Sequence, residues 1–140
     1  MSQENVHIIR RANEALNRGD IVGMAEFFAP NVVYFEREAY LDTPPVVRGR
    51  EACVEAMSHF IEAFSDFNAE LEELMDAGDC VVTVTHWRGS GAGSGASVDL
   101  REVIAWRFQE GLAIEGRVFA TKQDALEAVG LSEQDAHTDS

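Results

Sequence analysis

Ionisable side chains fall at alternating positions of two segments that are expected to be β-strands. Tyr34 and Glu36 lie two positions apart in residues 32–36, and Glu102 lies in residues 98–108. Side chains two positions apart on a strand point to the same face. A carboxyl group and a phenol that face one another can accept, hold and donate protons. The spacing therefore predicts a proton-transfer site between these strands.

A histidine is expected on a third strand, residues 80–88. Alternation groups His86 with Val84 on one face, and folding the following hairpin brings His86 roughly opposite Glu102. A neighbouring carboxylate orients a histidine and keeps it basic, which suits proton transfer. Two alternatives stay open: a one-residue change of alternation turns His86 outward and Trp87 inward, and His86 could be a core histidine with satisfied hydrogen bonds. The predicted catalytic set is Tyr34, Glu36, His86 and Glu102.

Apolar side chains are expected to form the walls around these groups. The helix over residues 50–64 carries several on one face, and the strands supply the others. The same residues are also typical core residues. The predicted substrate-binding set is Met57, Phe60, Phe64, Val84, Ile104, Trp106 and Val118.

The periodicity of the chain predicts an α+β domain. Helical spacing covers residues 5–18, 21–28, 50–64 and 121–130, and strand patterns cover residues 32–36, 66–75, 80–88, 98–108 and 112–120. The last three strands form an antiparallel meander, which needs cover on at least one face. We expect a strongly curved antiparallel sheet whose concave face is covered by three helices from the first half of the chain, as a cone-shaped barrel. Such a cone tends to enclose a ligand cavity.

Composition limits the partners and the domain count. The 140 residues carry a net charge of −14, which argues against nucleic-acid binding because phosphate neutralisation needs clustered Lys and Arg. One domain is expected over residues 1–131, followed by an acidic, frayed tail over residues 132–140. No apolar run reaches the roughly 20 residues of a membrane span, and the amphipathic start lacks a signal core, so we expect a cytoplasmic protein.

The sequence predicts neither a metal site nor an organic cofactor. Cys53 and Cys80 stand far apart, and the histidines lack metal-ligand spacing. Residues 91–96 match a GxGxxA pattern, but a strand follows where a dinucleotide site needs a helix, so this segment is expected to be a hairpin tip.

Four segments resemble the nuclear transport factor two-like superfold and, within it, the SnoaL-like group. They are NEALNRGDIVGMAEFFAPNVVYFE, VVRGREACVEAMSHFIEAF, ELMDAGDCVVTV and REVIAWRFQEGLAIEGRVFATKQDALEAVGL. The superfold hosts isomerases, polyketide cyclases, epoxide hydrolases, dehydratases and non-catalytic binders, so it does not choose the chemistry.

The resemblance also relates two positions of this chain to functional residues of ketosteroid isomerases. It places Glu36 where ketosteroid isomerases carry their general base, and it places Ile104 near their oxyanion-binding Asp. Because Ile104 cannot donate a hydrogen bond, steroid isomerisation is disfavoured. The resemblance further implies a homodimer through the outer face of the sheet, expected to carry Val103, Ala113, Arg117 and Phe119.

Two functions remain for such a chain. The first is cofactor-independent acid–base chemistry of the isomerase, cyclase or hydratase type on a small hydrophobic carbonyl compound. The second is a small-molecule-binding or sensing dimer of the same fold without catalysis. Whether the protein is an enzyme is left open by the residues themselves.

Overall fold

The computed structural model describes residues 2–37, 45–91, 97–131 and 137–138. Most of the expected hairpin tip, residues 92–96, and most of the acidic tail lie outside the described residues. The two described tail residues form strand β7 and pair with β3, whereas a frayed tail was expected. Within the described part, no helix is both long and apolar enough to cross a bilayer.

The elements follow the predicted order with small shifts, except for two short strands at residues 46–48 and 137–138 that the sequence did not predict. They are α1 (Ser2–Asn17), α2 (Ile21–Met24), the 3₁₀ turn η1 (Ala25–Phe27), β1 (Phe28–Phe35), β2 (Val46–Arg48), α3 (Arg50–Glu62), β3 (Asn68–Ala77), β4 (Cys80–Ser90), β5 (Ser97–Gln109), β6 (Leu112–Phe119), α4 (Lys122–Ala128) and β7 (His137–Thr138). The helix expected over residues 21–28 is shorter, because one 3₁₀ turn leads directly into β1.

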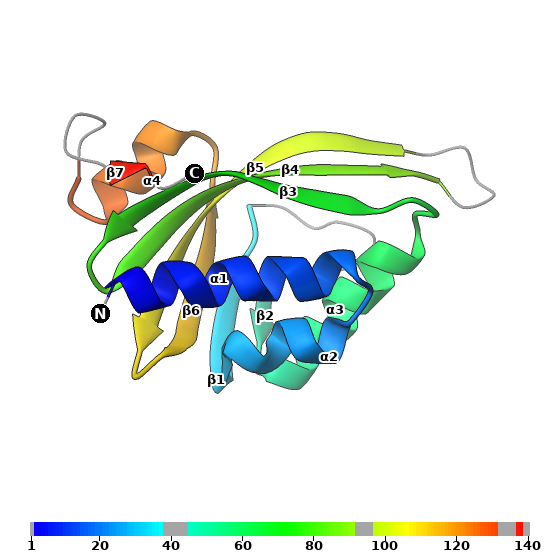
Figure 1. Cartoon of the computed structure of the whole chain (residues 1–140), viewed down its shortest axis with the longest axis horizontal. Coiled ribbons are helices and arrows are strands. Elements are labelled where there is room, and N and C mark those ends of the chain that lie inside the picture. Colours follow the sequence, from blue (N-terminus) through cyan, green and yellow to red (C-terminus); the bar gives the residue numbers. More distant parts are fainter. Residues whose placement is uncertain (1, 38–44, 92–96, 132–136, 139–140) are drawn as a thin grey trace.

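The strands form one bent sheet with the order β2-β1-β6-β5-β4-β3-β7. All neighbours are antiparallel except β1 and β6, which run parallel. Irregularities between Leu71 and Glu73 on β3, and between Arg107 and Phe108 on β5, add the local twist that bends a sheet. Helices α1, α2 and α3 lie on one side of the bent sheet and α4 on the other (Figure 1). The predicted curved α+β fold is therefore confirmed, with one parallel pair inside it.

Capping residues and a hairpin turn set the ends of several helices and strands. Asp20 caps α2 by accepting a hydrogen bond from the Gly23 N–H, and Thr121 caps α4 by accepting one from the Asp124 N–H. The β5–β6 hairpin turns at Glu110 and Gly111, both with positive φ, as a two-residue hairpin turn requires.

Helix α1 is fastened to the edge of β3 by two asparagines. The side-chain amides of Asn13 and Asn17 donate to the Ala69 carbonyl at 2.9 and 2.7 Å, and the Ala69 N–H donates back to Asn17 Oδ1 at 2.8 Å. Ala69 is fully buried, so these bonds satisfy backbone groups that water cannot reach. They hold α1 across the concave face.

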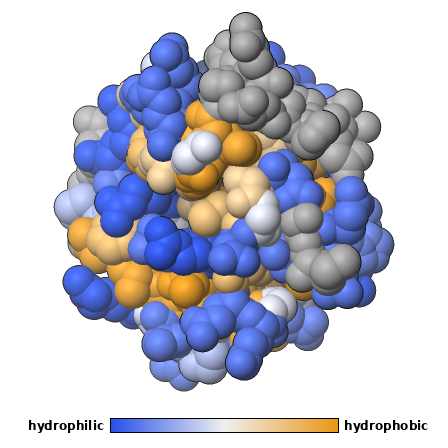
Figure 2. All heavy atoms as spheres, turned by 90° about the vertical axis from the view of Figure 1, so that its left-hand side faces the viewer, coloured by the Kyte–Doolittle hydropathy of each residue, from blue (hydrophilic) through white to orange (hydrophobic). Residues whose placement is uncertain are grey.

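The outer face of the sheet is only partly the surface that the sequence predicted. Val103 and Phe119 do lie there, but they pack with Leu126 of α4 in a second, smaller core. Ala113 is buried in the main core instead, next to the irregularity in β5, so its predicted outward position was wrong. Seen from the α4 end, apolar side chains appear as a broken patch between hydrophilic ones (Figure 2).

Gly116 gives the first test of this packing. A Cβ on Gly116 would lie 2.5 Å from the Trp106 ring and 2.9 Å from the Tyr34 ring. Gly116→Ala therefore forces both rings to shift, and we expect it to lower the free energy of unfolding by about 1–3 kcal/mol. Urea unfolding followed by circular dichroism measures this loss. Ser97→Ala, at an exposed site on β5, should change stability by less than about 0.5 kcal/mol, and an equal effect of both substitutions would contradict the packing.

Candidate active site

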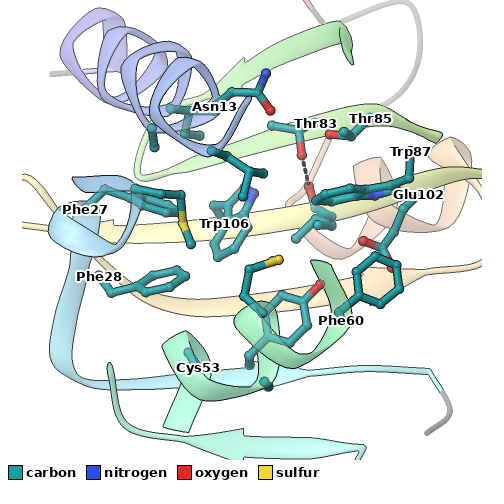
Figure 3. Close-up of a pocket in the computed structure, with 18 of the residues that line it drawn as sticks. Asn13, Phe27, Phe28, Cys53, Phe60, Thr83, Thr85, Trp87, Glu102 and Trp106 are labelled. Carbon is teal, nitrogen blue, oxygen red and sulfur yellow. Dashed lines mark hydrogen bonds between the residues drawn. The ribbon is translucent and has the colours of Figure 1, made fainter. Parts of the chain in front are cut away.

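A cavity of about 150 Å³ lies between the concave face of the sheet and helices α1, α2 and α3. Its walls are mostly apolar and aromatic, with Phe27, Phe28 and Trp106 at one side (Figure 3). The Phe27 and Trp106 rings meet edge to face, with centroids 5.1 Å apart. The polar groups in the lining are Asn13, Tyr34, Glu36, Thr83, Thr85, Trp87 and Glu102. An apolar cavity with a few polar groups is typical of a small-molecule site.

The structure brings most of the predicted site residues to this cavity. Tyr34 and Glu36 come from β1 and the residue that follows it, and Glu102 comes from β5. The predicted wall residues that line the cavity are Met57, Phe60, Ile104 and Trp106. The alternation predicted for β1 and β5 is therefore correct, while the catalytic roles stay predictions.

Three predicted wall residues lie elsewhere. Phe64 follows the end of α3, where it stacks with Phe60 at 5.3 Å and packs against Gly89. Val118 belongs to the main core but is not among the residues lining the cavity. Val84 faces the other side of the sheet and packs in the smaller core under α4. These residues support the fold rather than the cavity.

The predicted position of His86 in the cavity was wrong. On β4 the residues that face the cavity are Thr83, Thr85 and Trp87, so His86 points to the outer face. Every residue from Val81 to Trp87 is buried, because this central strand is covered on both sides. Burial of both faces removes the polar–apolar contrast that normally reveals strand alternation, and the one-residue alternative is the correct one.

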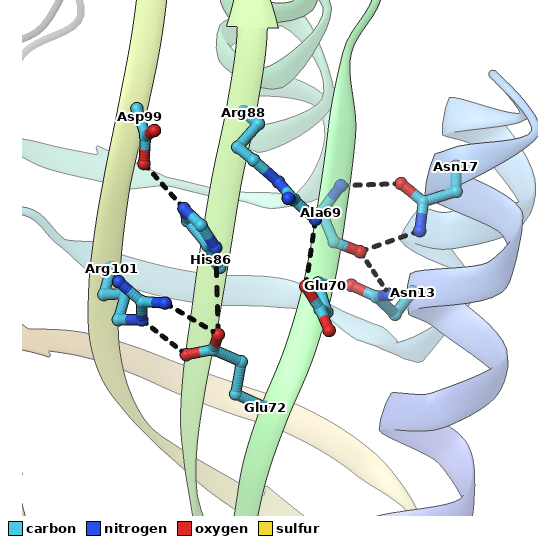
Figure 4. A network of polar contacts seen from close by, with 9 residues as sticks. All are labelled: Asn13, Asn17, Ala69, Glu70, Glu72, His86, Arg88, Asp99 and Arg101. Atoms are coloured by element: carbon cyan, nitrogen blue, oxygen red, sulfur yellow. Dashed lines mark hydrogen bonds and ion pairs between the residues drawn. The ribbon is translucent and has the colours of Figure 1, made fainter.

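His86 belongs instead to a polar network across β3, β4 and β5 (Figure 4). Its Nε2 lies 2.6 Å from Asp99 Oδ1 and its Nδ1 lies 3.7 Å from Glu72 Oε2. The His86 hydrogen bond holds the pKa of Asp99 below its ordinary value. Arg101 donates to both oxygens of Glu72, at 2.7 and 3.1 Å. The network therefore cross-links three strands on the face away from the cavity.

Part of this network has the geometry of a metal site but the wrong charges. Ligand atoms of Glu70, Glu72 and His86 lie within 4.8 Å of one another. Arg88 pairs with Glu70 at 2.9 Å, and Arg101 pairs with Glu72, so each carboxylate already has a cation. These arginines oppose a divalent ion at this place.

Glu102 is an acid with a strongly raised pKa. Burial, the charge of Glu36 and a hydrogen bond to Glu36 together raise the pKa of Glu102 from 4.5 to about 8, and burial is the largest cause. Two carboxyl groups this close cannot both ionise readily in an apolar site. At neutral pH the pair therefore keeps one proton between its two carboxyl groups, and it presents one acid and one acceptor to the cavity.

Two other side chains adjust this acid. Tyr34 is hydrogen-bonded to Glu102, and burial together with the nearby carboxyl groups raises the pKa of Tyr34 well above its ordinary value, so its hydroxyl stays protonated. The indole of Trp87 lies near enough to favour the charged form of Glu102. However, Trp87 Nε1 is buried and makes no hydrogen bond of proper geometry. Its N–H is thus a spare donor beside the acid.

Cys53 is the remaining candidate nucleophile in the lining. Burial raises the pKa of its thiol to about 11, so Cys53 is a neutral thiol at physiological pH. Since the thiolate is the reactive form, the cavity offers acid–base groups rather than a thiol nucleophile.

Sequence reasoning did not place Trp87, Thr83 and Thr85 in the site. The open alternative for β4 contained the signal, since a Trp with a polar N–H on a strand of valines and threonines has a reason to face a cavity. Only the register of β4 against β5, with Thr85 opposite Glu102, identifies these neighbours.

The raised pKa of Glu102 makes stability depend on pH. The folded state binds a proton on Glu102 between pH 4.5 and about 8, where the unfolded chain has released it. The free energy of unfolding therefore falls as pH rises through this window. Glu102→Gln removes the ionisable group at this position. We therefore expect its free energy of unfolding, relative to that of wild type, to rise by about 2–4 kcal/mol between pH 5 and pH 9. Urea unfolding at both pH values measures this. The exposed Glu55→Gln should show no such pH-dependent gain, and a gain of equal size in both variants would contradict the assignment.

The chain is similar to known proteins in sequence and in fold. The SnoaL-like domain family matches residues 9–116. No curated protein gives a significant match. Among solved structures, Bal32a from a soil-derived mobile gene cassette superposes with a TM-score of 0.75 at 22% identity, covering 84% of this chain and 89% of that one.

Two further structures show the same fold. A putative SnoaL-like polyketide cyclase from Jannaschia sp. CCS1 gives a TM-score of 0.71 at 22% identity, covering 84% of this chain and 85% of that one. TerC, co-crystallized with polyporic acid, gives a TM-score of 0.71 at 18% identity, covering 90% and 98%. At these identities the similarity establishes the fold alone. Because the family match spans most of the chain, this protein belongs to the SnoaL-like domain family.

Proposed function

We propose that the protein is a cofactor-independent acid–base enzyme of the isomerase or cyclase type that acts on a small hydrophobic carbonyl compound. The observation that carries the proposal is the half-buried Glu102–Glu36 pair, which keeps one proton at the wall of an apolar cavity. Membership in the SnoaL-like family is consistent with this class, and one neighbour is described as a putative polyketide cyclase. Fold alone would not select the chemistry.

The two carboxyl groups divide the reaction between them. The carboxylate of Glu36 removes a proton from the carbon next to the carbonyl, and the C–H electron pair moves into an enolate. The protonated Glu102 donates a hydrogen bond to the enolate oxygen, where charge develops. The proton on Glu36 then returns to the same or a conjugated carbon. No electron or atom is gained from outside, so the step needs no cofactor.

Tyr34 supports this division of roles. Its hydroxyl is hydrogen-bonded to Glu102 and stays protonated, because the pKa of Tyr34 is raised well above its ordinary value. A protonated phenol next to the acid stabilises negative charge as it passes between oxygen atoms. The apolar walls exclude water, which strengthens each of these interactions.

The alternative function is ligand binding without turnover. The observation that favours it is Ile104, an apolar side chain in the lining at the place where ketosteroid isomerases hold a donor. The same cavity would then retain its ligand unchanged. Binding of a ketone without any proton exchange would identify this function.

Exchange of the α-protons of cyclohexanone in D₂O, followed by proton NMR, tests the proposed chemistry without knowledge of the natural substrate. We expect the wild-type protein to accelerate exchange. Glu36→Gln removes the base and should lower the catalysed rate by about 10²–10⁴-fold. Glu102→Gln keeps a weaker donor and should lower it by about 10–100-fold.

Two variants serve as controls. His86→Gln changes the outer face of the sheet, and Glu55→Gln changes an exposed site on α3, so both should exchange cyclohexanone at the wild-type rate. Circular dichroism confirms that each variant is folded. Wild-type rates in both Glu36→Gln and Glu102→Gln would refute the proposed enzyme.

A further inference from the structure

The indole N–H of Trp87 is a buried donor without a partner. Trp87 is 8% exposed. Among the buried side-chain nitrogen and oxygen atoms of the described residues, its Nε1 is the one without a hydrogen bond. A buried donor left unpaired costs about 1–3 kcal/mol. Because Trp87 lines the cavity, an acceptor on a bound molecule recovers this cost.

The strand register places this donor beside the acid of the site. Trp87 lies opposite Leu100 in the β4–β5 pairing, and Thr85 lies opposite Glu102. Trp87 and Glu102 are therefore diagonal neighbours on one face, a spacing that large side chains bridge. An oxygen atom bound next to Glu102 thus lies within reach of a second donor, the Trp87 N–H (Figure 3).

The charge of the lining restricts what carries that oxygen. No Lys or Arg is among the residues lining the cavity, whereas Glu36 and Glu102 are. An anionic ligand would lie beside the carboxyl pair in an apolar space without a counter-charge, which is costly. An ammonium ion has no acceptor for the Trp87 N–H. An uncharged molecule with an acceptor oxygen satisfies both conditions.

The size of the cavity limits the molecule further. A cavity of about 150 Å³ is large enough for benzene. We propose that Trp87 is the residue that selects the ligand, and that the cavity takes an uncharged, single-ring compound whose carbonyl oxygen accepts a hydrogen bond from Trp87 Nε1. The inference names the substrate class of the proposed function and therefore rests on it, but it is tested by binding alone.

Two probes of the same shape separate the hydrogen bond from apolar burial. Cyclohexanone carries the acceptor oxygen, and methylenecyclohexane replaces that oxygen with a CH₂ group. Dissociation constants in H₂O are measured by NMR chemical-shift titration of the protein. We expect Trp87→Phe to weaken cyclohexanone binding about 5–10-fold more than methylenecyclohexane binding, the range for one buried hydrogen bond.

Trp106→Phe is the matched control, because it shortens another indole in the same lining, and the Trp106 nitrogen is not among the buried donors without a partner. It should weaken both probes by the same factor. Should Trp87→Phe fail to fold, Trp87→benzothienylalanine keeps the shape of the indole and removes only the N–H. It should show the same selective loss.

The remaining outcomes overturn the inference. They are equal weakening of both probes by the Trp87 substitutions, binding of cyclohexanecarboxylate tighter than cyclohexanone at pH 7, and no binding of either uncharged probe to the wild-type protein. Failure of the proposed enzyme gives a different result. In that case cyclohexanone binding depends on Trp87 while its α-protons do not exchange.

Discussion

The burial of one carboxyl group governs the chemistry of this cavity. Glu102 projects from the middle of β5 into an apolar space that it shares with Glu36, and the loss of hydration together with the nearby charge raises its pKa to about 8. An exposed carboxyl would be ionised and would repel the base beside it. Because burial keeps the proton on Glu102, the same pair of residues supplies both an acid and a base. The hydroxyl of Tyr34 and the indole of Trp87 gain their functional meaning from this protonated group.

The fold supplies the burial through a few specific contacts. Asn13 and Asn17 hold α1 over the concave face by hydrogen bonds to Ala69. The missing side chain of Gly116 makes room for the rings of Trp106 and Tyr34, which form the wall opposite the helices. On the other face of the sheet, α4 and the ion pairs of His86 occupy the surface, so acid–base residues on the two faces have separate roles.

Sequence patterns predicted the parts of this arrangement where a pattern carries contrast. Alternation on β5 placed Glu102, Ile104 and Trp106 on the cavity face, and helical spacing located the four helices. Alternation failed on β4, because a strand buried on both faces has no polar side to identify. As a result, the sequence placed His86 in the cavity, where the structure has Trp87. The raised pKa of Glu102 depends on its burial and on a contact with Glu36, the residue that follows β1, and no local pattern contains either of them.

The protonation state of Glu102 can be measured directly. Carbon-13 labelling of glutamate side chains, with Glu102→Gln to assign the resonance, allows NMR to follow the Glu102 carboxyl carbon from pH 4 to pH 10. We expect a titration midpoint of about 8 and a Glu102 carboxyl group that is mostly protonated at neutral pH. A midpoint near the ordinary value of 4.5 would show that the cavity holds a charged pair, and the acid role of Glu102 would be lost.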